Sequence, residues 1–144
     1  MEYYSDFAKS FMRRTLEIAQ QYQGPYDATL LVNCLLGLLV VPKESLIEKI
    51  PQDSFDKLSD WGMDPRSIKH FGKCDYGHAH QPNLRQLVRR LRNAVAHFRI
   101  DPVNVDGQVS GFRFEDRSGF KAVLTLAEMQ AFVTRLAKHL EDHA

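Results

Sequence analysis

The sequence predicts an all-α fold, an up-and-down four-helix bundle with one β-hairpin inserted before the last helix. Four segments carry apolar residues at helical spacing, and glycine, proline and aspartate punctuate the chain between them. One short region, 112–124, alternates apolar and polar residues as strands do. Amphipathic helices bury their apolar faces well in an antiparallel bundle. The length of 144 residues predicts a single domain, residues 1–144.

The first predicted helix covers residues 5–23, with Ser5 as its N-cap and Gly24-Pro25 as its stop signal. The second covers residues 28–41, between Asp27 and Pro42, and is apolar around most of its circumference. A membrane span needs roughly 20 apolar residues, so this shorter segment predicts a buried core helix. The first residues lack the pattern of a signal peptide, and we expect a cytoplasmic protein with no membrane partner.

A short amphipathic helix is expected over residues 44–50, followed by an irregular stretch up to Pro82. Within it, residues 53–61 and 65–71 each predict one or two helical turns. We expect Trp61 to anchor this stretch to the bundle.

The clearest helix signal begins after Asn83, which is a good N-cap residue. Apolar residues recur there within about 100° of arc on a helical wheel. They are Leu84, Leu87, Val88, Leu91, Val95 and Phe98.

Beyond Ile100, Asp101-Pro102 and Asp106-Gly107 read as turns. Residues 112–115 and 120–124 predict the two strands of a hairpin. Thr125 and Glu128 form a capping-box signature, which opens a last helix that ends near Leu140.

The charge of the chain is uneven along the sequence. The formal net charge is only +1, so the whole molecule predicts no particular partner. Between Lys69 and Arg99, however, the chain has seven Lys or Arg residues against one acid, Asp75. This local excess predicts a surface that attracts phosphate. The residues expected to bind RNA phosphates are Arg85, Arg89, Arg90 and Arg99.

Candidate catalytic residues lie on the same predicted helix. The imidazole of His97 can exchange a proton near neutral pH, and the guanidinium of Arg92 can bind phosphate oxygens as charge builds up in a transition state. Asn93 shares the face of His97 and could orient it. Arg92 and His97 lie roughly 140° apart around the helix, so one helix cannot readily direct both at one target. Two copies meeting across a two-fold axis could do so, and we expect a homodimer.

Arg92-Asn93-Ala94-Val95-Ala96-His97 resembles the Arg-x4–6-His motif of HEPN domains, in which a polar residue commonly follows the arginine. The motif also stands in the expected place, late in the third main helix with a final helix after it. Residues 33–44 (NCLLGLLVVPKE) are similar to a small stand-alone bacterial subfamily of HEPN proteins.

This resemblance implies a dimeric, metal-independent endoribonuclease of a toxin–antitoxin or other defence system, with RNA as substrate, no cofactor and a possible antitoxin partner. Arg92 and His97 become the catalytic pair and Asn93 the accompanying polar residue. Some HEPN toxins carry, two residues after the histidine, a tyrosine that a nucleotidyltransferase antitoxin modifies. This chain has Arg99 there, which argues against that route of neutralisation.

Two other functions remain open from the sequence. Some HEPN-type proteins are inactive, so the chain could be a non-catalytic module that binds RNA or a protein. Cys74, His78 and His80 could instead stabilise an interaction protein through zinc, but zinc usually takes four ligands in well-spaced pairs. The expectation is therefore a site without metal, and a solvated polar loop over these residues.

Overall fold

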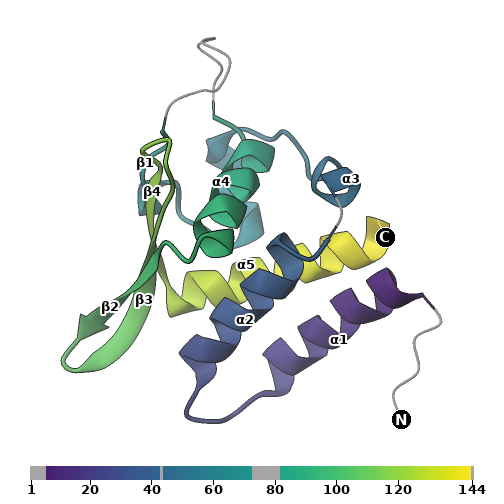
Figure 1. Ribbon diagram of the computed structural model, residues 1–144, viewed down its shortest axis with the longest axis horizontal. Coiled ribbons are helices and arrows are strands. Elements are labelled where there is room, and N and C mark those ends of the chain that lie inside the picture. The colour runs from purple at the N-terminus through teal and green to yellow at the C-terminus, as the bar shows by residue number, and fades with distance from the viewer. Residues whose placement is uncertain (1–5, 43, 73–81, 144) are drawn as a thin grey trace.

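The computed structural model describes residues 6–42, 44–72 and 82–143, and these form helices packed beside a four-stranded antiparallel sheet (Figure 1). The prediction of an all-α fold is therefore wrong, and the protein is a mixed α/β structure. The strands are β1 (Ile68–His70), β2 (Ile100–Val105), β3 (Gln108–Glu115) and β4 (Lys121–Thr125), in the spatial order β1-β4-β3-β2.

The helices lie close to their predicted positions. They are α1 (Phe7–Gln21), α2 (Asp27–Leu39), the short α3 (Glu44–Ile47), α4 (Leu84–Ala96) and α5 (Leu126–His143). Two predicted caps are present: the Asn83 side chain accepts from the Gln86 N–H at 2.9 Å, and Thr125 and Glu128 cap each other reciprocally. Helix α1 is capped by Asp6, one residue after the expected Ser5.

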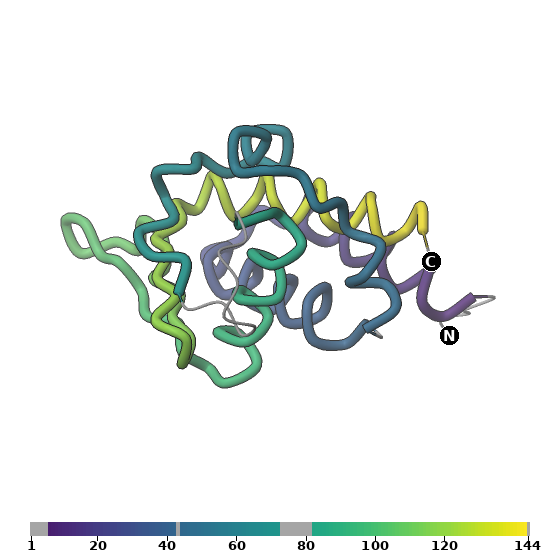
Figure 2. The backbone as a smooth tube through the Cα atoms, turned by 90° about the horizontal axis from the view of Figure 1, so that it is seen from above, coloured from purple at the N-terminus to yellow at the C-terminus, as the bar shows by residue number. Residues whose placement is uncertain are grey.

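The helices do not form a simple four-helix bundle. Helix α1 packs against α5 and α2, α2 also packs against α4 and α5, and α4 lies between α2 and strand β3 (Figures 1 and 2). One face of α4 is covered by helices, where Leu87, Val88 and Leu91 are buried. Strand β3 contributes Phe114 to the same core. Helix α4 is thus held between α2 and β3, and this packing fixes which of its side chains face the solvent.

Strands β3 and β4 confirm the predicted hairpin, with Phe114 paired to Ala122 and both fully buried. Strand β2 was not predicted, because Asp101-Pro102 resembles a turn. It is an edge strand, where proline is tolerated since the outer edge needs no N–H donor. Asp106-Gly107 is a turn as expected: both residues have positive φ, 54° and 79°, and they join β2 to β3.

The segment between α3 and α4 is partly as predicted. Residues 53–61 contain the 3₁₀ helix Phe55–Trp61, whereas in 65–71 a single turn, Pro65–Ser67, leads directly into β1. Trp61 anchors the segment as expected: it is buried, its ring centroid lies 5.2 Å from that of His139, and the Arg135 guanidinium lies 4.2 Å from its ring. Gly62, at φ 82°, allows close approach to α5, because a Cβ there would lie 2.4 Å from the Ala131 Cβ.

Candidate nucleic-acid interface

Helix α4 ends earlier than its apolar periodicity predicts. The last helical residue is Ala96, and His97 is the C-cap, its N–H donating to the Asn93 carbonyl. Phe98 then takes a left-handed conformation with φ 52°, and the Arg99 N–H closes the helix end by donating to the Ala94 carbonyl at 2.7 Å. The prediction that Phe98 belongs to the buried face is therefore wrong: 75% of the residue is exposed.

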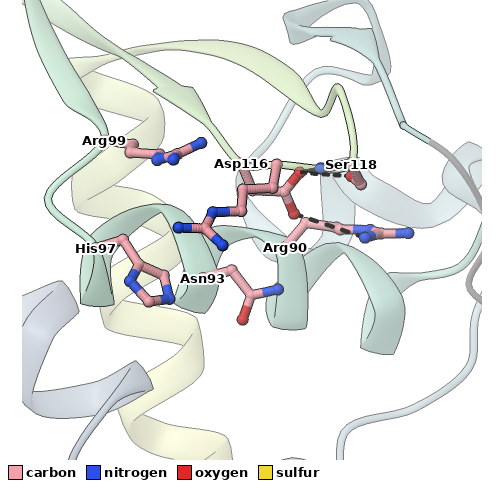
Figure 3. A pocket seen from close by; sticks show the side chains of 7 residues that line it. Arg90, Asn93, His97, Arg99, Asp116 and Ser118 are labelled. Atoms are coloured by element: carbon pink, nitrogen blue, oxygen red, sulfur yellow. Dashed lines mark hydrogen bonds and ion pairs between the residues drawn. The ribbon is translucent and has the colours of Figure 1, made fainter.

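A pocket of about 460 Å³ opens beside this helix end (Figure 3). Helix α4 supplies Arg90, Asn93 and its cap His97, and Arg99 stands just before β2. The remaining wall is the turn between β3 and β4. That turn contributes Asp116, Arg117 and Ser118.

Asp116 organises the turn that forms this wall. Its Oδ1 accepts from the backbone N–H of Ser118 at 2.8 Å and of Phe120 at 3.3 Å, and also from the Ser118 hydroxyl. Its Oδ2 lies 3.6 Å from Nη1 of Arg90, and both side chains are almost fully buried. The carboxylate therefore ties the turn to α4 and is not a free ligand within the pocket.

Arg90 was expected to belong to a surface that attracts phosphate, but it is largely buried. Its side chain is only 10% exposed, because the β3–β4 turn covers it from one side. Its guanidinium also lies 5.4 Å from the centre of the Phe71 ring. The wheel could not show this, since Phe71 and Asp116 lie far from Arg90 in the sequence.

The other arginines of α4 point to a different neighbour, α3. Glu44 forms ion pairs with both Arg89, at 2.8 Å, and Arg92. The hydrogen bond from Arg92 is the main cause that holds the pKa of Glu44 below its usual range, against a smaller opposing effect of burial. Arg85 donates to the Ile50 carbonyl at 2.7 Å. Arg85, Arg89 and Arg92 thus form one arginine row facing α3 and the segment that follows it.

Of the predicted site residues, four line the same pocket: Arg90, Asn93, His97 and Arg99. Arg92 is held apart from His97. This matches their angular separation on the helical wheel. Within the pocket, three arginines stand against one aspartate, before any proton on His97 is counted. Such a lining attracts an anion, and planar guanidinium groups suit phosphate oxygens.

A protein-family model described as HEPN pEK499 p136 matches residues 1–144. The chain belongs to this HEPN family. No curated protein and no solved structure matches it. The resemblance drawn from the Arg92–His97 segment is thus confirmed at the level of the family, and the protein is a HEPN-type module.

Arg117 and Ser118 are site residues of this HEPN protein that the sequence did not reveal. They read simply as part of a turn, and no local signal shows that the turn folds back over α4. The prediction for Cys74, His78 and His80 lies outside the described residues. Within the described ranges, no three His, Cys, Asp or Glu side chains are grouped so as to hold a metal ion, and no helix is long and apolar enough to span a bilayer.

Proposed function

We propose that this HEPN protein is a metal-independent endoribonuclease that acts as a homodimer. The observation that carries the proposal is the position of Asn93 and His97 in an arginine-lined pocket at the end of α4. A proton-transfer group beside several phosphate-binding groups is what cleavage of RNA requires. The family match supports the same class of activity.

In the proposed reaction, the ribose 2′-hydroxyl attacks the adjacent phosphorus while His97 removes its proton. The bond to the 5′-oxygen of the next nucleotide breaks, and the protonated His97 gives the proton that it has taken up to that oxygen. Arg92 stabilises the negative charge that builds up on the phosphate oxygens. The products are a 2′,3′-cyclic phosphate and a 5′-hydroxyl. Asn93, on the face of His97, orients the imidazole or binds a substrate oxygen.

One feature supports a homodimeric site. Arg92 is directed to Glu44 and His97 lines the pocket, so one protomer does not present both to one phosphate. Two-fold pairing of the α4 ends would place the Arg92 of one protomer near the His97 of the other.

The chemistry of the pocket supports metal independence, because its one carboxylate, Asp116, is already bound by the turn and by Arg90.

The proposal is tested by cleavage of a mixed-sequence single-stranded RNA with added chelator. We expect the parent protein to cut and to leave cyclic phosphate ends. His97→Ala and Arg92→Ala should each lose about 100-fold or more in rate, the usual scale for removing an acid–base or charge-stabilising group. Arg13→Ala, on α1, serves as a charge-matched control for Arg92→Ala and should cut like the parent. Undiminished cleavage by both site variants would overturn the proposal.

A non-catalytic RNA-binding module is the second candidate, and one observation favours it. Arg92 is already paired with Glu44 and not directed into the pocket. Such a module would bind RNA through the same arginines, with loss of binding on Arg92→Ala and no product at any protein concentration.

We also propose that the protein acts as a toxin or defence effector, in line with its family, and that an antitoxin protein is its partner. Expression of the parent protein should then arrest bacterial growth, and expression of the His97→Ala variant should not. Growth unaffected by a parent protein that cleaves RNA in vitro would remove this role and leave the enzymatic proposal standing.

A further inference from the structure

Phe98 is unfavourable for folding in two independent ways. It is the second of two non-glycine residues with positive φ in the described ranges, the other being Asp106 in the β2–β3 turn. Aspartate is tolerated in that conformation, whereas a bulky side chain is an outlier. The residue is also 75% exposed, so its ring gains little from burial.

Glycine is the residue that this backbone position favours. Phe98 directly follows the C-cap of α4, where the chain reverses so that Arg99 can donate to the Ala94 carbonyl. Helices that end in this way usually place glycine there, because it has no Cβ to clash in the left-handed region. A strained residue that packs against little points to a contact outside the folded chain.

The position of Phe98 indicates what that contact is. Its two chain neighbours, His97 and Arg99, both line the arginine-rich pocket, so the backbone of Phe98 passes the edge of this pocket. Within the described ranges, the other large exposed apolar side chains belong to different segments: Phe7, Ile18, Tyr22, Tyr26, Val40, Val41 and Val105. A single aromatic ring among cationic groups is a poor core for a protein interface but a good platform for a flat base.

We propose that Phe98 stacks on a nucleobase of single-stranded RNA whose adjoining phosphate is bound in the pocket. This rests on RNA being the ligand of the proposed site and adds the form of RNA that it takes. Arg99 and Arg117 bind the phosphate, and Phe98 covers one face of the base. In a duplex both faces of each base are covered by neighbouring pairs, so this contact requires an unpaired strand.

The test separates the folding effect of Phe98 from its binding effect. The probe is a fluorescent, mixed-sequence, 2′-O-methylated single strand, which lacks the attacking hydroxyl and cannot be cut by the proposed route. Phe98→Gly should raise the melting temperature by about 2 to 5 °C, because the left-handed strain is relieved. The same variant should bind the probe about 5- to 150-fold more weakly, the range for loss of one stacked base.

Phe98→Trp, which keeps an aromatic face, should bind the probe within about two-fold of the parent, while Phe98→Leu should bind like Phe98→Gly. Tyr26→Ala is the matched control, since Tyr26 is 70% exposed and is the N-cap residue of α2. It should bind like the parent. A duplex of the same sequence should bind with an affinity that does not depend on residue 98.

Equal affinity of Phe98→Gly and the parent for the single strand would overturn the inference. So would a change in oligomeric state on sedimentation that accounts for the loss of affinity, because the ring would then be a contact between copies. If Phe98→Gly loses binding but the parent does not cut RNA that carries 2′-hydroxyls, the stacking inference stands and the nuclease proposal fails.

Discussion

At the scale of single residues, the ion pairs of Glu44 determine where two side chains of the arginine row are held when no RNA is bound. Glu44 is about half exposed, and so the pairs it makes with Arg89 and Arg92 contribute little to folding stability. The Glu44 carboxylate is nevertheless bound to the guanidinium group of Arg92, which we assign to the scissile phosphate. RNA would have to compete with Glu44 for Arg92.

Replacing Glu44 with glutamine should therefore strengthen RNA binding. The variant removes one negative charge and frees two arginines, and an exposed pair of this kind corresponds to about 2- to 5-fold in the dissociation constant. Fluorescence anisotropy with the uncleavable single strand measures this. Glu48→Gln makes the same change of charge four residues later, at an exposed position, and should have a smaller effect. Equal or weaker binding by Glu44→Gln would show that Glu44 positions Arg92 instead of competing for it.

Some properties of the site residues could be predicted from the sequence and others could not, for a physical reason. The separation of Arg92 from His97 follows from helical geometry alone and could be read from the wheel. The burial of Arg90 depends on a turn that lies 26 positions further along the chain, at Asp116. Contacts of that kind come from tertiary packing, which periodicity does not encode. Arg117 was missed for the same reason.

At the scale of elements, the β3–β4 turn forms the wall that, together with the end of α4, encloses the pocket. Asp116 is its key residue, because one carboxylate both closes the turn and pairs with Arg90 across to α4. Gly72 fits closely against this turn, since a Cβ on it would lie 2.2 Å from the Ser118 Oγ. The wall of the pocket is therefore a packed structure and not a loose loop.

Asp116→Ala should destabilise the protein by about 3 kcal/mol, the lower end of what is lost when one partner of a buried ion pair is removed. For a chain of this size that corresponds to a fall of roughly 10 °C in melting temperature. Thermal denaturation at neutral pH measures it. Asp101→Ala, on the exposed edge strand, is the control and should change stability by less than about 0.5 kcal/mol. A loss as small as that of the control would mean that Asp116 does not hold the turn to α4.

Among the elements, helices could be predicted better than strands. The apolar spacing of α1, α2, α4 and α5 is a local signal and placed each of them closely. Strand β2 carries Asp101-Pro102, which signals a turn unless the strand lies at a sheet edge. Strand β1 has only three residues, and it exists because β4 is there to pair with it. The all-α prediction failed because β2 carries a turn signal and because β1 pairs with β4, a segment distant in sequence.

At the scale of the whole molecule, His139 links the C-terminal helix to the rest of the fold. It is buried against Trp61, and its Nε2 donates to the Lys49 carbonyl at 3.1 Å. Burial lowers the pKa of His139, and the positive charges of His143 and Arg135 act in the same direction, opposed by the hydrogen bond to Lys49 and by Asp142. The folded protein therefore disfavours a proton on His139.

Stability should consequently fall in mild acid. In the unfolded chain a histidine titrates near pH 6.5, so the stabilisation is fully present above about that pH and is lost as the pH drops through the lowered pKa of the folded state. Melting temperatures of the parent at pH 7.5 and pH 5.5 should show the decline. His139→Gln should decline less between the two values, and His70→Gln, an exposed histidine of β1, should behave like the parent. Equal declines for parent and His139→Gln would contradict this assignment.

The molecule as a whole is expected to work as a pair, because His97 lines the pocket while Arg92 faces α3. Heterodimers with Arg92→Ala in one protomer and His97→Ala in the other test this most directly, with two affinity tags to purify the mixed species. Each homodimeric variant alone should be about 100-fold or more below the parent in RNA cleavage. If the site joins Arg92 of one protomer with His97 of the other, the heterodimer should regain cleavage at least about ten-fold above either variant. A heterodimer as inactive as its two parents would contradict the shared site.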